Sequence, residues 1–138
     1  MSEFGLHLTI DASQCNKRNL TSQSVVYDIL NKMPENIGMT KMTLPYVAKW
    51  IDKFSTSTTP GISGFVMLAE SHISIHTFPD YDYAFIDIFS CKSFDAEDVA
   101  RQFAEVFEAK KVTKNIIKRG LDFPAKVYSE SPSVVTEK

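Results

Sequence analysis

The chain has 138 residues, of which 43% are hydrophobic and 23% are charged, values that are typical of a globular protein and exclude a disordered chain. The length fits one domain over residues 1–138 with one core. The net charge of -2 gives no indication of a nucleic-acid partner or an anionic membrane surface. The first residues show neither a signal peptide nor a membrane span, so we expect a cytoplasmic protein.

The first third of the sequence predicts a strand followed by a helix. Leu6, Leu8 and Ile10 alternate with polar residues, which is the pattern of a half-buried strand. The next segment predicts a helix that begins after Thr21 or Ser22 and ends at Pro34, with these apolar residues at helical spacing: Val25, Val26, Ile29, Leu30 and Met33. We expect a second strand within residues 38–44, whereas residues 45–54 fit either a strand or a short helix.

The rest of the chain predicts four more strands and one more helix. A polar loop over residues 55–61 precedes strands at 63–69, 72–78 and 83–91, and the last two of these are joined by a turn at 79–82. Asp95 caps a helix with an apolar face, and residues 111–120 form a last strand. We expect the tail, residues 129–138, to be mobile.

This order predicts an α+β fold, a two-layer sandwich in which a mainly antiparallel sheet carries two helices on one face. The segments 64–69 and 83–89 are apolar on both faces of their strands. The second face of the sheet therefore also needs a cover, and the simplest cover is the same face of a second copy. We expect a homodimer with the layer order αββα.

The candidate reactive residues are ordinary when each is considered alone. His72 and His76 are four residues apart on a predicted strand, about 13 Å, so they cannot bind one metal ion. Cys15 and Cys91, the two cysteines, fall outside any metal-binding spacing, and no metal site is expected. Cys91 follows a strand, where a cysteine is usually a buried thiol but can also be a proton donor or a nucleophile.

In combination, the segment GISGFVMLAESHISIHTFPDYDYAFIDIFSC, residues 61–91, resembles the S-adenosylmethionine decarboxylases of the bacterial and archaeal type. These enzymes process themselves and use a pyruvoyl group. The resemblance rests on Glu70-Ser71-His72 at the start of a strand, a histidine five residues after Ser71, and a cysteine twenty residues after it. It extends over nearly the whole chain.

The resemblance implies that the chain cuts itself between Glu70 and Ser71 into a β chain, residues 1–70, and an α chain, residues 71–138. Ser71 would become a covalent pyruvoyl cofactor, which forms a Schiff base with the substrate amine and accepts electrons as carbon dioxide leaves. Cys91 matches the proton donor of the family, and His76 and Ser63 match residues that assist self-processing. The product, decarboxylated S-adenosylmethionine, donates aminopropyl groups for spermidine synthesis.

Strand geometry adds an independent expectation. If strands 63–69 and 71–77 form a hairpin around Ala69 and Glu70, Ser63 faces His76 directly. Ser71 and His76, however, have opposite parity and point to opposite faces of a regular strand. Either a bulge intervenes, or the histidine and Ser63 of one protomer serve the Ser71 of another.

The substrate residues match the family less closely. Phe78, Pro79 and Asp80 stand where many relatives carry Trp-Pro-Glu, of which the acid holds the ribose hydroxyls. Phe54 is the aromatic residue available for stacking on adenine from the preceding loop. Arginine or ornithine are therefore alternative substrates. Two other classes also remain open, namely a binding or regulatory domain that never processes, and a hydrolase that uses Cys91 and His76.

Overall fold

In a computed structural model, residues 4–51, 53, 59–69 and 71–124 are described. They form six strands: β1 (Gly5–Ser13), β2 (Tyr46–Trp50), β3 (Gly61–Met67), β4 (Ser71–Phe78), β5 (Tyr83–Ser90) and β6 (Lys111–Arg119). The helices are α1 (Lys17–Leu20), α2 (Gln23–Asn36) and α3 (Ala96–Phe107), and a 3₁₀ turn, η1, spans Pro79–Tyr81. Within these described residues, no helix is both long enough and apolar enough to cross a membrane.

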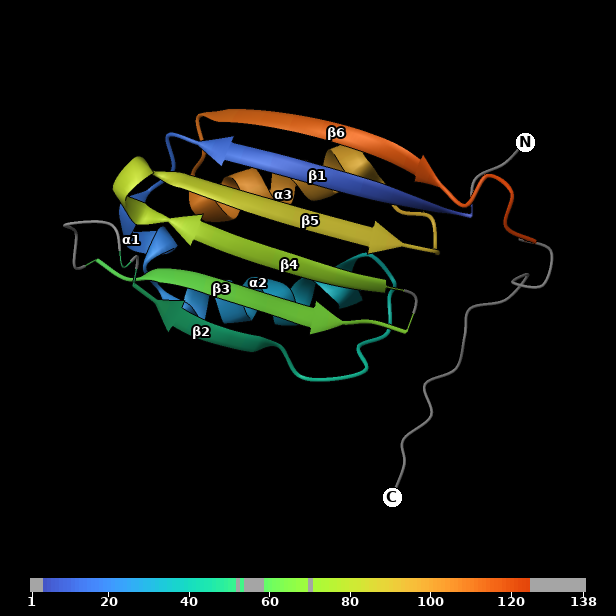
Figure 1. The fold of residues 1–138 in the computed structure, drawn as a ribbon, viewed down its shortest axis with the longest axis horizontal. Helices are drawn as coiled ribbons and strands as arrows, with labels where there is room; N and C mark the ends of the chain where they lie inside the picture. The colour runs from blue at the N-terminus through green and yellow to red at the C-terminus, as the bar shows by residue number, and fades with distance from the viewer. Residues whose placement is uncertain (1–3, 52, 54–58, 70, 125–138) are drawn as a thin grey trace, which may run out of the picture.

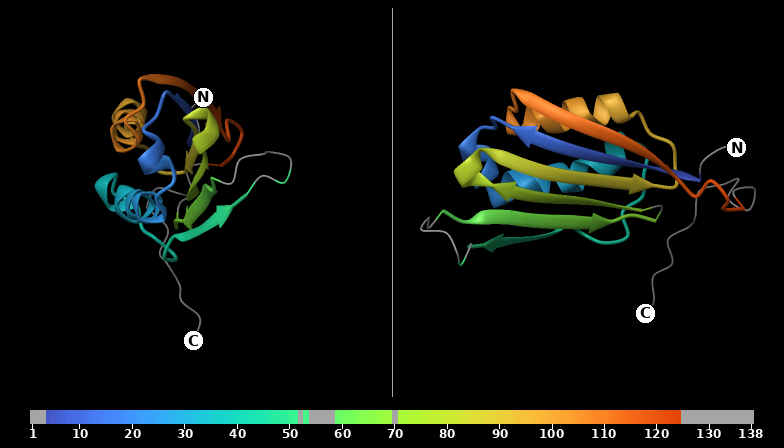
Figure 2. Two further views of the ribbon diagram at one scale, coloured as in Figure 1. Left: turned by 90° about the vertical axis from the view of Figure 1, so that its left-hand side faces the viewer. Right: turned by 45° about the horizontal axis from the view of Figure 1, so that its top comes forward.

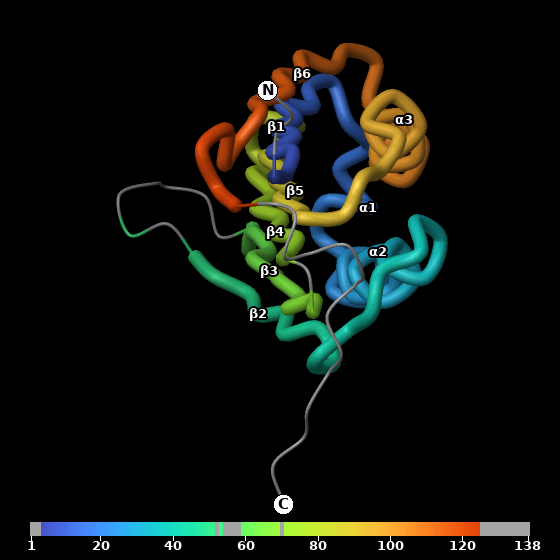
Figure 3. Tube along the Cα trace, turned by 90° about the vertical axis from the view of Figure 1, so that its right-hand side faces the viewer, coloured from blue at the N-terminus to red at the C-terminus, as the bar shows by residue number. Residues whose placement is uncertain are grey.

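The six strands form one sheet with the order β2-β3-β4-β5-β1-β6 (Figure 1). Every neighbouring pair in this order is antiparallel. Helices α2 and α3 lie on one face of the sheet, as Figures 2 and 3 show from its two ends. The predicted α+β architecture, with an antiparallel sheet and helices on one face, is confirmed.

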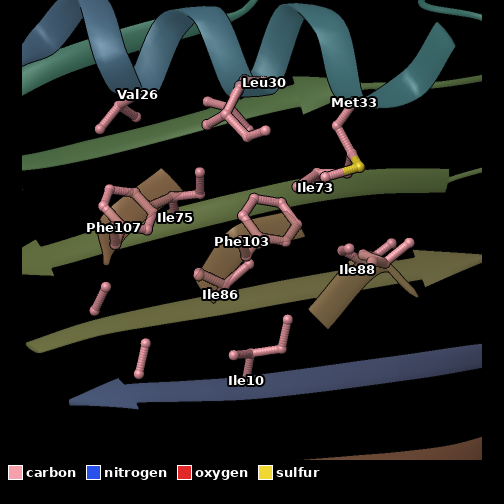
Figure 4. Packing of buried hydrophobic residues seen from close by; sticks show 14 of the residues in the cluster. Ile10, Val26, Leu30, Met33, Ile73, Ile75, Ile86, Ile88, Phe103 and Phe107 are labelled. Atoms are coloured by element: carbon pink, nitrogen blue, oxygen red, sulfur yellow. The ribbon is translucent and has the colours of Figure 1, made fainter. Parts of the chain in front are cut away.

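The core lies between this sheet and the two long helices. Alternate strand residues point into it, among them Ile10, Ile73, Ile75, Ile86 and Ile88, which are at most 1% exposed. Figure 4 shows them meeting Val26, Leu30 and Met33 of α2 and Phe103 and Phe107 of α3. Burying an aliphatic or aromatic side chain of this size contributes roughly 1.5–3 kcal/mol, so these residues fix which face of β1, β4 and β5 is the inner one.

The start of α2 follows its sequence signal, whereas its end does not. Ser22 is the N-cap, and its side chain accepts a hydrogen bond from the Val25 amide. The predicted end at Pro34 is wrong, because the helix continues to Asn36. A proline fixes φ near the helical value and lacks only its own N–H, so in the last turn it removes one hydrogen bond without ending the helix. Asp95 caps α3 as predicted.

The second strand also differs from the prediction. It is β2, Tyr46–Trp50, which lies in the segment that fitted either a strand or a helix. Residues 38–44 contain a single bridge, between Lys41 and Leu68, instead of a strand. The backbone of this segment is hydrogen-bonded to the end of β3 around that bridge, from the Met42 amide to the Met67 carbonyl and from the Ala69 amide to the Thr40 carbonyl. The Lys41 ammonium donates to Asn31 Oδ1 of α2 at 2.6 Å.

The face of the sheet that carries no helix, here called the open face, is rich in apolar side chains. Tyr46, Phe65, Met67, Phe85 and Ile117 are between 42% and 67% exposed there. Their positions follow from the register, in which each alternates with an inward residue. An apolar surface of this kind on a sheet is typical of an interaction site.

Candidate active site

The β3–β4 hairpin turns between Leu68 and Ser71. The Leu68 amide donates to the Ser71 carbonyl at 2.8 Å, and the Ser71 amide donates to the Leu68 carbonyl at 3.2 Å. Glu70, the residue before the predicted cleavage point, lies outside the described residues. The predicted register is confirmed, because Ser63 is the partner of His76 in the ladder.

Ser71 is the first residue of β4 and pairs with Ser90 of β5. It has the same parity as Ile73 and Ile75, whose side chains are buried under the helices. Its hydroxyl oxygen is inaccessible to solvent and has no hydrogen-bond partner among the described residues. An unpaired buried hydroxyl costs roughly 1–3 kcal/mol, and such a cost is typical of a group that is kept for chemistry.

Ser63 and His76 form a polar pair on the open face. Ser63 Oγ lies 2.8 Å from His76 Nδ1, a hydrogen bond whose direction depends on the tautomer of the ring. The serine is half-buried and the imidazole is exposed. The pair therefore offers a base or an acid at the surface of the sheet, where a second molecule can reach it.

The pair is remote from Ser71 of the same chain. The register of β4 with β5 runs without interruption from Ser71 to Phe78, so no bulge changes the parity within this strand. Five strand residues span about 17 Å, and the two side chains also lie on opposite faces. The structure therefore rules out the bulge that the sequence left open.

Cys91 directly follows Ser90, the last residue of β5, and lies six residues along the chain from Phe85, the ladder partner of His76. Ser90 is the ladder partner of Ser71. The backbone of Cys91 is therefore close to the predicted cleavage point. It is half-buried and is not in a disulfide. Strand alternation gives it the parity of Phe85, Asp87 and Phe89, which belong to the open face.

An aromatic cluster adjoins the Ser63–His76 pair. Trp50 and Phe78 have ring centroids 5.2 Å apart, and Phe78 meets Phe85 at 5.5 Å. The indole lies over Gly61, where a Cβ atom would approach two indole carbons to 2.6 and 2.7 Å. The indole N–H of Trp50 is buried and has no partner among the described residues.

Two of the three predicted substrate residues can be placed. Phe78 ends β4 within the aromatic cluster, and Asp80 is exposed in η1, two residues further on. Phe54 lies outside the described residues. Sequence reasoning missed Trp50, because its position depends on β2, a segment that the sequence left ambiguous. The pairing of Trp50 with Gly61 of β3 is the feature that identifies it.

The site residues thus form two groups on β3, β4 and β5. The model of a family described as S-adenosylmethionine decarboxylase matches residues 6–120. The chain belongs to this family. A proenzyme of this family from Thermodesulfovibrio yellowstonii is 32% identical over 98% of this chain and 99% of its own length. One from Clostridium botulinum (strain Loch Maree / Type A3) is 36% identical over 87% and 97%.

A solved structure of the same family supports the fold. The adenosylmethionine decarboxylase from Aquifex aeolicus matches with a TM-score of 0.73 and 22% sequence identity, and the match covers 96% of this chain and all of that one. At this identity the likeness extends to the fold alone. The family expectation from residues 61–91 is confirmed by the family model and by the curated relatives.

Proposed function

We propose that this chain is the proenzyme of a pyruvoyl-dependent S-adenosylmethionine decarboxylase that cuts itself between Glu70 and Ser71. The observation that carries the proposal is the unpaired, buried Ser71 hydroxyl at the first residue after a hairpin turn. The names of the curated relatives, which are proenzymes, agree with it. Its product, decarboxylated S-adenosylmethionine, would serve as an aminopropyl donor in spermidine synthesis.

The residues at the turn fit self-processing. The Ser71 oxygen attacks the carbonyl of Glu70, and an amide becomes an ester as the hydroxyl proton leaves for a base. Among the described residues, the Ser71 hydroxyl makes no hydrogen bond that would have to break before it attacks. The resulting pyruvoyl group supplies an electrophilic carbonyl that accepts the electrons released as carbon dioxide leaves.

The base that accepts this proton is His76, held by Ser63, and it comes from a second copy. Within one chain the pair lies about 17 Å along β4 from Ser71. A twofold axis between two open faces that crosses the strands near Ser74 brings the Ser71 end of one β4 over the His76 end of the other. Stacked sheets lie about 10 Å apart, a spacing that the imidazole can bridge once Ser71, the first residue after the turn, rotates from the helix side of its strand to the open face.

The same pairing assembles the decarboxylation site. Cys91 of one protomer holds the proton that the substrate carbon receives after carbon dioxide leaves. Phe78 and Trp50 of the other protomer provide aromatic surface for the adenine, and Asp80 provides a carboxylate for the ribose hydroxyls. The apolar residues of the open face would be buried in this αββα dimer, which explains why they are tolerated at the surface of the monomer.

The mass of the purified protein tests the processing. We expect two fragments that part between Glu70 and Ser71, with a blocked N-terminus on the second. A Ser71→Ala variant should remain intact, whereas Ser93→Ala, a change in an exposed loop serine, should process normally. A wild-type chain that stays intact would overturn the proposal and favour a binding or regulatory role.

The substrate is tested on the processed protein. S-adenosylmethionine, arginine and ornithine are offered in parallel, and the products are identified by mass. We expect carbon dioxide release from S-adenosylmethionine. Turnover of arginine or ornithine instead would show that the chain uses the same decarboxylation chemistry on a different substrate. The cytoplasmic location expected from the sequence stays a prediction.

A further inference from the structure

Phe89 is the centre of a cluster on the open face that the proposed function does not use. Its ring has the rings of His72 on β4 and His7 on β1 on either side, each with a centroid distance of 6.1 Å. The guanidinium of Arg119, on the edge strand β6, lies over the ring at 4.4 Å from its centroid. His7 Nε2 in turn lies 3.3 Å from Asp87 Oδ1.

The backbone register brings these residues into one place. His72 pairs with Phe89, and Phe89 pairs with His7, so the three side chains stand in a row across neighbouring strands. Arg119 pairs with Gly5, the residue of β1 that lies beside this row. A Cβ atom at Gly5 would come within 3.1 Å of the Phe89 ring, so the absence of a side chain at Gly5 provides space for this ring.

The cluster adjoins the residue that changes in processing. His72 directly follows Ser71, so it becomes the first complete amino acid of the processed α chain. Before the cut, Ser71 is held by the covalent bond to Glu70 and by hydrogen bonds in both directions with Leu68. Processing as proposed breaks the bond to Glu70 and releases the Ser71 nitrogen as ammonia, with water supplying the oxygen that replaces it.

Two of the restraints on position 71 are therefore lost together. The peptide bond to Glu70 is gone, and the donor of the 3.2 Å hydrogen bond to the Leu68 carbonyl is gone with the nitrogen. The Leu68 carbonyl then lacks the N–H group that it bonds in the precursor. The 2.8 Å hydrogen bond from the Leu68 amide to the carbonyl of residue 71 remains. The next attachment to the sheet is the side chain of His72, so its position affects where residue 71 points.

We propose that Phe89, held by Arg119 and His7, clamps His72 and thereby positions the residue at which the processed α chain begins. The inference rests on the proposed self-processing. His72, Phe89 and Arg119 are positioning residues in this scheme, because they act on residue 71 through the strand. The clamp also lies on the open face with Cys91, toward which residue 71 has to turn from its place under the helices.

The charge state of the cluster agrees with this role. Partial burial, followed by the nearby His7 and Arg119, lowers the pKa of His72, while Asp87 acts in the opposite direction. A neutral imidazole beside a permanently charged guanidinium avoids repulsion between two cations on one aromatic ring.

Hydrogen exchange on two forms of the protein tests the clamp. The variants are Arg119→Met and the matched Lys118→Met, which removes the same charge from the adjacent, exposed residue on the other face of β6. Each is prepared as processed enzyme and as an uncleavable precursor that also carries Ser71→Ala. The readout is the exchange of the first amides of the α chain, His72 and Ile73, measured by mass spectrometry without substrate.

In the processed protein, we expect these amides to exchange about two- to fivefold faster with Arg119→Met than with Lys118→Met, the loss that an exposed cation–π contact implies. In the precursor the two variants should exchange alike, because Glu70 still holds the chain. Phe89→Leu should reproduce the effect of Arg119→Met. The clamp would be overturned if the two variants exchanged at the same rate in the processed protein, or if they differed by the same factor in the precursor. Failure of the wild-type chain to cleave would overturn the proposed function instead.

Discussion

Ser63 Oγ and His76 Nδ1 lie 2.8 Å apart across the ladder between β3 and β4, on the face of the sheet away from the helices. The hydroxyl of Ser71 belongs to the opposite face of the same β4 strand. Their separation within one chain is the geometric reason why we propose a site shared between protomers.

Co-expression of two inactive chains tests the shared site. His76→Ala alone should slow processing by about 10²- to 10⁴-fold, the usual contribution of a positioned general base. With Ser71→Ala as its partner chain, the His76→Ala chain should be cut, because the heterodimer holds one intact serine and one intact histidine in the same site. Cleavage is followed over time by intact mass.

The matched control for this experiment is the double variant Ser71→Ala/His76→Ala as the partner chain, which supplies no histidine and should give no rescue. Native mass spectrometry establishes that heterodimers form. Heterodimers that form in the first mixture but remain uncut would show that the histidine does not act across the interface.

Cys91→Ala should separate processing from turnover. The change removes the proposed proton donor but leaves Ser71 and the Ser63–His76 pair, so cleavage should continue. The turnover number should fall by about 10²- to 10⁴-fold. Protonation of the wrong carbon would also leave alanine at the start of the α chain, which its mass reveals. Normal turnover in this variant would exclude Cys91 as the donor.

Trp50→Leu should weaken binding of the substrate more than it slows processing. Loss of an aromatic contact implies an increase of about two- to tenfold in the KM for S-adenosylmethionine. Tyr46→Leu, on the same strand but far from Phe78, is the control for a general disturbance of β2. Cleavage kinetics and KM are measured on both variants, and an unchanged KM in Trp50→Leu would remove the indole from the adenine site.

The stability of the wild-type protein should depend on pH through His72. Its pKa is lowered in the folded state by partial burial, by His7 and by Arg119, with Asp87 opposing them. The unfolded state therefore binds more protons near pH 6, so the free energy of unfolding rises with pH across the interval between the folded and unfolded pKa values. Below that interval the contribution is fully lost.

His72→Gln has no titratable group and should lose less stability than the wild type when the pH falls from 7.5 to about 5.5. Urea unfolding of the Ser71→Ala precursor, with and without this change, isolates the effect from processing. Parallel pH profiles for the two proteins would mean that His72 titrates alike in both states.

The two cysteines should differ in reactivity. Burial, followed by the charge of Asp82, raises the pKa of Cys15 to about 11, so its thiolate is scarce at pH 8. Cys91 is half-buried at the end of β5. Iodoacetamide on the folded protein should therefore modify Cys91 first, which peptide mapping reads directly. Preferential labelling of Cys15 would contradict its burial, which leaves only 7% of the residue exposed.

The features that the sequence predicted best depend only on strand alternation and on residues that are close together in the chain. The pairing of Ser63 with His76, and the opposite facing of Ser71, both follow from counting along two strands that share a short turn. The position of β2 could not be predicted, since Tyr46–Trp50 has no strict alternation and its strand character depends on pairing with β3. Trp50 was missed for the same reason, because its neighbour Phe78 is far away in sequence.

The order of the strands has a consequence for the cut chain. A break at Glu70 assigns β1, β2 and β3 to one fragment and β4, β5 and β6 to the other. In the sheet, however, β1 of the first fragment lies between β5 and β6 of the second. The two fragments are interlocked, and separating them requires β1 to leave two strands at once. The proposed self-cleavage would therefore create a new chain end in the middle of an intact sheet, where the strands on both sides would keep the reactive group in place.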